Sequence, residues 1–410
     1  MIAERESFTG LPGWLILLGA LNAIGPLSID MYLPGLPAIA TDLHTYPGAM
    51  QRTLALFFIG LSLGQLFYGP SSDRFGRKPP LYVGLTLYAV ASIGCAFAAD
   101  VHALTIWRFV QGLGGCAGIV IPRAVVRDRC DPLSMARALS LLMLVMGLAP
   151  ILAPLLGNAV MALSSWRALF IFQTVFGLAC LLLVVIGMRE THDVRDAAPL
   201  QIGFVLRNYA GLFREGRFLR PALAGVLAQG GLFAYIVGSP FVLIQIYGIP
   251  ASMFGWVFGV NAVGLIAGSQ INARLVRRVP LPVLLRRALW MVAITTVLSL
   301  AAQLAGLMSL PAMLGCLFIC VSSLSFIGPN TGALALQHQA HRAGTASALL
   351  GSLQFGMGAL TGLAMSLWHR ADALPLLSVM AACGVGALLM AGIGGATSIE
   401  TPPPKPLIAD

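Results

Sequence analysis

The chain alternates between long apolar runs and short polar connections along almost its whole length. A helix needs about 20 apolar residues to cross a bilayer, and these runs lack the alternating pattern of strands. The pattern predicts twelve membrane-spanning helices, at residues 13–34, 52–69, 80–99, 103–123, 138–161, 168–188, 220–246, 254–273, 284–308, 311–334, 344–367 and 373–393. We therefore expect an all-α integral membrane protein. Its composition agrees, because 58% of the residues are hydrophobic and only 10% are charged, against about 25% charged in soluble domains.

The basic residues are distributed unevenly between the two faces of this predicted bundle. Twenty-one of the 25 Lys and Arg residues fall on one face, against three on the other, Arg52, Arg167 and Arg370. By the positive-inside rule the rich face is cytoplasmic, which places both termini inside. The net charge of +10 therefore reports topology and does not indicate a nucleic-acid partner. The first apolar run lacks a small-residue cleavage site before Asp30, so we expect a retained helix.

The longest polar stretch divides the chain into two halves of six helices. We expect an N-terminal half at 1–188, a linker at 189–219, a C-terminal half at 220–395 and a cytoplasmic tail at 396–410. Apolar and basic residues mix in the linker as in a helix that lies on the membrane surface: Phe204, Val205, Leu206, Arg207, Tyr209, Leu212, Phe213 and Arg214.

A densely charged segment connects the second and third predicted helices. An ordinary positive loop would explain its cations but not the glycines and the aspartate at their spacing. The pattern consists of Gly69, Asp73, Arg74, Gly76, Arg77 and Lys78. A weaker echo follows the eighth helix, with Gly268, Asn272, Arg274, Arg277 and Arg278. This echo favours a duplicated fold.

Two further patterns lie inside helices. The fourth helix carries Arg108, Gln111 and Gly112 in an R-x-x-Q-G element, and the fifth carries a glycine and proline motif. The motif comprises Gly147, Pro150, Pro154 and Gly157. Its prolines each remove a helix hydrogen bond and should bend the helix, while its glycines permit close contact with a neighbour.

These motifs together resemble the major facilitator superfamily of secondary transporters. The loop pattern resembles the superfamily's connection between helices 2 and 3, and the helix 5 motif resembles that of its exporters. The R-x-x-Q-G element also resembles one of the superfamily. Further segments along the chain are similar to the Bcr/CflA subfamily of drug:proton antiporters: 29–34, 147–157, 166–167, 231–235, 238–241 and 344–351. The resemblance implies two pseudo-symmetric halves and proton-driven export of small amphipathic drugs across the bacterial inner membrane by alternating access. It also implies that Asp73 anchors closure at the cytoplasmic side, with the start of helix 11 near Gly344 and Thr345 as its partner.

Two charged residues lie well inside predicted helices. Asp30 in helix 1 and Arg108 in helix 4 stand at similar depths, and each would cost roughly 2.5–3.5 kcal/mol at a helix centre. We therefore expect both to face the protein interior and each other, with Asp30 as the proton carrier and Arg108 as the group that orients it. A purely structural ion pair is the alternative. Related exporters often carry a second acid before the helix 1 aspartate, where this chain has Asn22.

Polar and aromatic side chains on the apolar helices suggest a drug-binding cavity around this pair. Each of these side chains could instead join helices or fill the core. The candidates for substrate binding are Asn22, Met31, Phe57, Phe58, Gln111, Tyr235, Phe241, Gln245, Asn261, Asn330 and Gln354, with Gln229 as a further polar position.

Other classes of protein find less support. The sequence has no G-x-x-x-x-G-K-[ST] and no H-E-x-x-H motif, so we do not expect an enzyme. Its seven cysteines form no C-x-x-C pair, and we expect neither a metal nor a cofactor. We expect a monomer whose partners are drugs, protons and the bilayer. A proton-coupled transporter of a metabolite or nutrient on the same fold remains the alternative function, because fold does not determine substrate.

Overall fold

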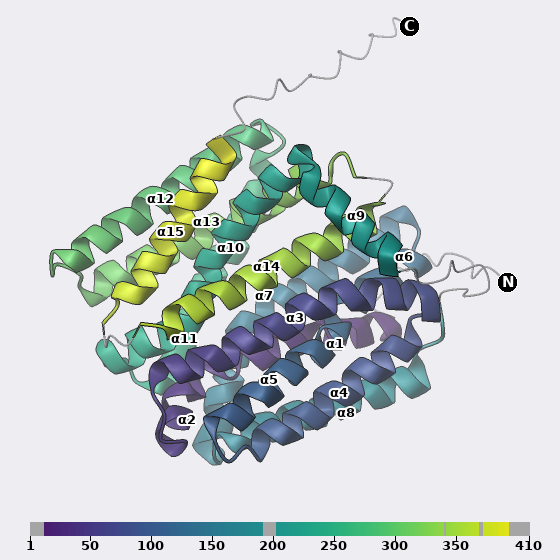
Figure 1. The fold of residues 1–410 in the computed structure, drawn as a ribbon, viewed down its shortest axis with the longest axis horizontal. Coiled ribbons are helices and arrows are strands. Elements are labelled where there is room, and N and C mark those ends of the chain that lie inside the picture. Colours follow the sequence, from purple (N-terminus) through teal and green to yellow (C-terminus); the bar gives the residue numbers. More distant parts are fainter. Residues whose placement is uncertain (1–11, 192–201, 340–341, 369–371, 393–410) are drawn as a thin grey trace, which may run out of the picture.

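The computed structural model describes residues 12–191, 202–339, 342–368 and 372–392. Within them, twelve segments are long and apolar enough to cross a membrane. They correspond one to one with the twelve helices predicted from the sequence, so the all-α membrane fold is confirmed (Figure 1).

The first six spans come from the N-terminal part of the chain. The first consists of α1 (Gly13–Asp30), the short 3₁₀ helix η1 (Leu33–Gly35) and α2 (Leu36–Asp42). The next five are α3 (Pro47–Phe75), α4 (Lys78–Ala96), the pair α5 (Val101–Gly115) and α6 (Ala117–Arg129), α7 (Pro132–Leu163) and α8 (Arg167–Gly187).

The linker contains one helix, α9 (Ile202–Arg214), as the sequence predicts. The last six spans are α10 (Gly216–Pro240) with the π-helical η2 (Phe241–Ile246), α11 (Ala251–Leu275), α12 (Leu281–Leu304), α13 (Leu310–Leu336), α14 (Ala343–Ser366) and α15 (Leu374–Gly392). Tyr209 and Leu212 of α9 are buried against α10, α13 and α14, whereas Phe213 is exposed. The side chains of Phe204, Val205 and Leu206 lie outside the described residues.

The first span of each half is irregular near one end. We expected one continuous helix over 13–34, but α1 ends at Asp30 and the span continues as η1 and α2. Pro34 and Pro37, which lack backbone donors, lie at the first turns of these two short helices. In the seventh span, Pro240 ends α10 and a π-helical turn follows.

The connection between α3 and α4 is much shorter than the sequence suggested. We expected a turn over 69–78, yet α3 continues through Asp73 and Arg74 to Phe75. The chain reverses at Gly76, whose φ of 88° is accessible to glycine at little cost. α4 then starts at Lys78 with prolines in its first turn.

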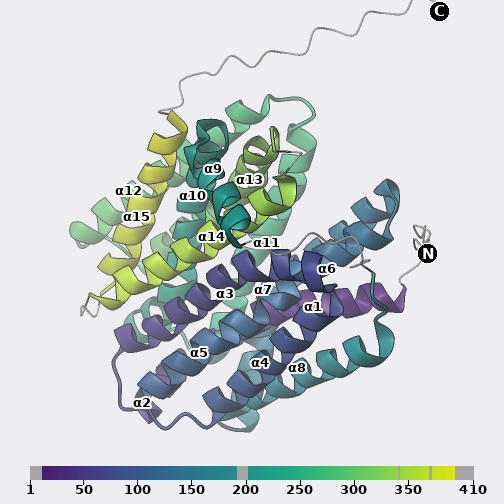
Figure 2. The same cartoon turned by 45° about the vertical axis from the view of Figure 1, so that its right-hand side comes forward.

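The two halves lie side by side and meet along two seams (Figure 2). In the first, between α3 and α14, Ser62 Oγ donates to the Ser352 carbonyl at 2.8 Å. In the second, between α7 and α11, Asn158 Nδ2 donates to the Ser252 carbonyl at 3.4 Å. Because the spans alternate in direction, α1 begins and α15 ends at the same end of the bundle, which we call the terminal face. The other end is the opposite face.

Candidate functional site

Arg108 lies inside the N-terminal half in an aromatic cage. Its side chain is fully buried on α5, and its guanidinium carbon is 4.2 Å from the ring centre of Phe57, 4.6 Å from that of Tyr32 and 5.9 Å from that of Phe170. Cations over aromatic faces are attracted by the ring quadrupole. Nη1 donates to Gln111 Oε1 at 2.6 Å, whereas Nε and Nη2 have no hydrogen-bond partner among the described residues.

Gln111 extends this cage into a network that joins four spans. Its Nε2 donates to Ser92 Oγ on α4 at 2.7 Å and to Gln173 Oε1 on α8 at 2.8 Å. Gln173 in turn donates to the Leu27 carbonyl of α1 at 3.3 Å. Gln111 therefore serves the packing of the N-terminal half, and the arrangement gives it no exposed face for a ligand.

Asp30 does not pair with Arg108, so the expectation that the two face each other is wrong. Asp30 is only 5% exposed, and its carboxylate makes no hydrogen bond or salt bridge with any described residue. The reason lies in the helix period. Ser28 bonds to Tyr88 and Tyr32 to Thr53, which marks the face of this span that points into the N-terminal half. Asp30 is two residues from both Ser28 and Tyr32. Its side chain is therefore rotated about 200° from theirs around the helix axis and lies on the other side of the span.

Across the boundary between the halves, Tyr235 of α10 lies within electrostatic range of the Asp30 carboxylate. Asn261 Nδ2 of α11 donates to the Tyr235 hydroxyl oxygen at 2.9 Å, which leaves the hydroxyl hydrogen available for another acceptor. The ring of Tyr235 stacks on Phe258 at 5.2 Å and 13°. The structure thus brings together Asp30, Tyr235 and Asn261 from three spans.

The other predicted binding residues do not gather around this group. Asn22 donates to the Leu142 carbonyl of α7 at 3.1 Å, and Asn330 pairs with Asn272 of α11. Both contacts join helices. Phe58 packs against Phe233 in the seam between the halves, at 4.7 Å between ring centres.

The remaining candidates differ in exposure. Met31 and Phe241 are buried, Gln229 and Gln354 are half-buried, and Gln245 is exposed. None of the three glutamines makes a hydrogen bond within the described part of the chain, so their amides are available to water or to a ligand.

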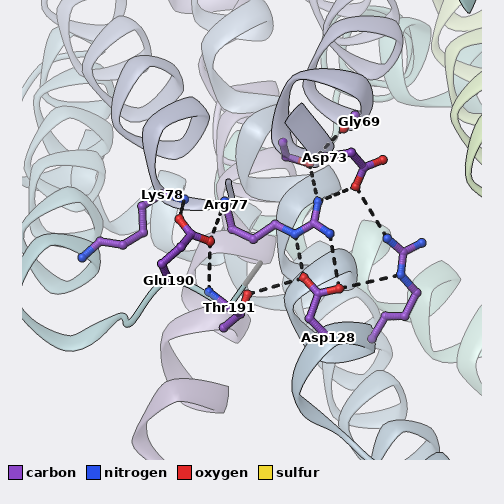
Figure 3. Close-up of polar contacts among 9 residues, drawn as sticks. Gly69, Asp73, Arg77, Lys78, Asp128, Glu190 and Thr191 are labelled. Atoms are coloured by element: carbon purple, nitrogen blue, oxygen red, sulfur yellow. Dashed lines mark hydrogen bonds and ion pairs between the residues drawn. The ribbon is translucent and has the colours of Figure 1, made fainter. Parts of the chain in front are cut away.

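A second polar cluster surrounds Arg77 at the terminal face (Figure 3). The buried guanidinium donates from Nε to Asp128 Oδ2 at 2.7 Å and from Nη1 to Asp73 Oδ1 at 2.6 Å. Burial opposes the charged form of Arg77, but the hydrogen bonds and ion pairs to Asp128 and Asp73 outweigh it and raise the pKa of this side chain. Arg127 also lies 3.7 Å from Asp73.

The connection itself is held by Glu190, just beyond α8. Its two carboxylate oxygens accept the backbone amides of Arg77 at 2.8 Å and Lys78 at 3.0 Å. A side chain at Gly76 would place its Cβ 2.7 Å from the same carboxylate. Asp128 and Glu190 were missed by the sequence analysis. Their position was the available signal. Each carboxylate lies among arginines just after a predicted helix, and these two helices end on the same face of the predicted bundle.

The glycine and proline motif of α7 lies between α1 and α11. A Cβ at Gly157 would stand 2.3 Å from the Met31 carbonyl, so only glycine fits this approach. A Cβ at Gly147 would meet Ile266 of α11 at 3.4 Å, an ordinary contact. Pro150 and Pro154 lie within α7. The motif therefore borders both the segment just after Asp30 and one seam between the halves.

The fold defines a polytopic membrane protein of two six-helix halves, and comparisons with known proteins identify its class. The model of the Major Facilitator Superfamily matches residues 18–362, and the chain belongs to this family of transporters. It is 34% identical to a bicyclomycin resistance protein homolog of Haemophilus influenzae over 92% of this chain and 94% of that one. It is 30% identical to the multidrug resistance protein MdtL of Escherichia coli O157:H7, with the same coverage. These relatives agree with the resemblance to the Bcr/CflA subfamily.

Solved structures show the same fold. A peptide transporter, POT, crystallised with sulfate, superposes with a TM-score of 0.75 at 14% identity, over 96% of this chain and 95% of that one. A D-xylose-proton symporter superposes with a TM-score of 0.70 at 15% identity, over 93% and 97% of the two chains.

Removing Asp128 should destabilise the protein far more than removing its neighbour Arg127. In Asp128→Ala the buried Arg77 loses its bidentate partner, which costs about 3 kcal/mol because Asp73 remains. Arg127→Ala removes a half-exposed pair worth less than about 1 kcal/mol. Thermal unfolding of both purified variants in the same detergent measures the difference. Equal melting temperatures would contradict the assigned role of Asp128.

Proposed function

We propose that the chain is a proton-coupled antiporter that exports small amphipathic drugs across the bacterial inner membrane by alternating access. The observation that carries this proposal is the position of Asp30, a buried carboxylate at the boundary between the halves that has no salt-bridge partner among the described residues. The names of the relatives, a bicyclomycin resistance homolog and a multidrug resistance protein, support drugs as the substrates.

Asp30 is the proton carrier in this proposal. The sequence contains no Asp or Glu between Glu215 and Asp372, so the spans of the C-terminal half supply no carboxylate. Asp42, Asp73 and Asp128, the other acids of the N-terminal spans, lie at or near helix ends. A charged carboxylate in a water-poor boundary is unfavourable unless it binds a proton or faces a donor. In this proposal Tyr235, which lies within electrostatic range of Asp30, is that donor.

Arg108 acts on Asp30 at a distance in this mechanism. Its charge remains inside the N-terminal half, held by the three aromatic rings and Gln111. A fixed positive charge in a medium of low dielectric constant lowers the cost of the deprotonated carboxylate without neutralising it. Proton binding and release at Asp30 then remain in balance.

Two motifs assist the conformational cycle. The cluster of Asp73, Arg77, Asp128 and Glu190 makes the connection from α3 to α4 rigid, so that Asp73 can latch the two halves when the terminal face closes. The α7 motif keeps the α7 and α11 seam tight as the halves rotate, which prevents a proton leak along it.

Asp30→Asn should abolish efflux driven by a proton gradient. The amide cannot exchange a proton, so purified protein should also lose drug-induced proton release while it folds and still binds drug. The assay combines a drug-susceptibility panel with proton release measured by a pH dye. Asp100→Asn, which alters an exposed helix cap, is the matched control and should behave as the unmodified protein.

Two results would decide against this assignment. Stoichiometric proton release that persists in Asp30→Asn would place the carrier at another group. If the unmodified chain protects a susceptible host from no drug of the panel yet transports a metabolite, the alternative function on the same fold is correct.

Tyr235→Phe should uncouple transport from the gradient without destroying the carrier. The ring still stacks on Phe258, but the hydroxyl within electrostatic range of Asp30 is gone, so the C-terminal half no longer responds to the charge of the carboxylate. We expect uphill transport in proteoliposomes to fall about tenfold, the loss of roughly one hydrogen bond that the Tyr235 hydroxyl would donate to the charged carboxylate during the cycle. Downhill exchange of substrate should continue at its normal rate. Equal losses in both assays would indicate a structural role instead.

The terminal face should lie in the cytoplasm. Single cysteines at Arg278 on the terminal face and at Asp100 on the opposite face, in a cysteine-free background, test this in intact cells. The positive-inside rule predicts that an impermeant maleimide labels only the Asp100→Cys variant. Labelling of Arg278→Cys from outside would reverse the orientation.

A further inference from the structure

The two halves differ in the groups that compensate the cations of their corresponding loops. In the N-terminal half, protein carboxylates pair with Arg77 and Arg127 around the loop between α3 and α4. Arg77 pairs with Asp73 and Asp128, Arg127 with the same two acids, and Glu190 holds the loop backbone. The buried cation of this loop therefore has its counterions within the protein.

The corresponding loop of the C-terminal half lacks these carboxylates. Where Asp73 stands in the first motif, the echo has Asn272, which exchanges two hydrogen bonds with Asn330 at 3.1 and 3.3 Å. This neutral amide pair links α11 to α13 and compensates no charge. No Asp or Glu occurs in the sequence from Gly216 to Ala371.

Five arginines gather around this loop within fourteen residues, and we call them the α11–α12 arginine patch: Arg274, Arg277, Arg278, Arg286 and Arg287. All five are exposed. Across the described residues, none of their side chains forms a salt bridge or a hydrogen bond. Five like charges this close repel one another, which an external anion would relieve.

The patch borders directly on lipid-facing side chains. Ile271 on α11 and Trp290, Met291 and Ile294 on α12 are 45–52% exposed. Trp290 and Met291 lie three to four residues beyond Arg286 and Arg287, and therefore on the same side of α12. Tryptophan beside arginine at the end of a span is typical of the membrane interface.

We propose that the α11–α12 arginine patch binds the phosphate headgroup of an anionic phospholipid, with the acyl chains along α11 and α12. Basic clusters at the ends of spanning helices attract anionic headgroups. The exposed apolar side chains beside the arginines favour a lipid over a soluble polyanion such as a nucleic acid, which would leave them without a partner.

The test is binding of dioleoylphosphatidylglycerol to the purified full chain in mixed micelles, followed by native mass spectrometry. The unmodified protein should retain this lipid in preference to dioleoylphosphatidylcholine. Arg277→Gln with Arg278→Gln should weaken retention about 30-fold, the change expected for two interfacial charges. Ala273→Glu with Val276→Glu, which adds the missing carboxylates at exposed positions, should weaken retention similarly without removing any arginine.

The matched control is Arg214→Gln with Arg217→Gln. It removes the same charge from exposed positions that flank Glu215 in the sequence, and it should leave retention within about twofold of the unmodified protein. Equal retention of the two lipids, or an unchanged value in the Arg277 and Arg278 variant, would overturn the proposal. Complete displacement of the lipid by excess inorganic phosphate would also overturn it, because the ligand would then be a soluble anion.

Discussion

The low dielectric constant of the bilayer interior governs where this chain places its charges. A charged side chain that leaves water must find compensation inside the protein. Arg77 finds it in the carboxylates of Asp73 and Asp128, and Arg108 in three aromatic rings and one amide. Asp30 finds neither a cation nor a hydrogen bond among the described residues. Of these three, it is the one whose charge state the structure leaves uncompensated.

The number of the spans could be read from the sequence because it depends on hydrophobic length. Their limits were less well predicted, since the first span continues to Asp42 and α3 to Phe75, beyond the expected ends at 34 and 69. The depths expected for Asp30 and Arg108 rest on the same reasoning, since each helix advances 1.5 Å per residue. Their orientation did not follow, because depth says nothing of the angle around a helix. Tyr32 and Ser28, one turn apart, point to the interior of the N-terminal half, and Asp30 lies between them on the other side.

The partners of Arg77 were missed for a different reason. Asp128 and Glu190 come from α6 and the end of α8, and only tertiary packing brings them to the loop.

The duplicated halves share a backbone plan but differ in polar chemistry. At the terminal face an ionic cluster binds α3 to α6 in one half, while a pair of asparagines binds α11 to α13 in the other. The ionic cluster is strong yet sensitive to the removal of a single partner, whereas the amide pair is neutral and carries no such cost. The corresponding loop of the C-terminal half thus has the positive charge of the first motif but lacks the carboxylates that pair with it in the N-terminal half.

In the proposed cycle, a boundary carboxylate without a salt bridge among the described residues provides a physical reason for obligatory exchange of drug and proton. In the proposed mechanism, rotation of the halves requires the boundary around Asp30 to close without water, and a bare negative charge makes that closure costly. A proton removes the charge, and a bound drug shields it or excludes the water that it needs. Either ligand lowers the barrier, while the empty deprotonated carrier cannot readily turn over. A salt bridge between Asp30 and Arg108 would neutralise the carboxylate permanently and let the empty carrier close. In the proposed mechanism, the confinement of Arg108 within its aromatic cage, 4.2 Å from Phe57 and without a salt bridge to Asp30, serves coupling better than the ion pair expected from the sequence.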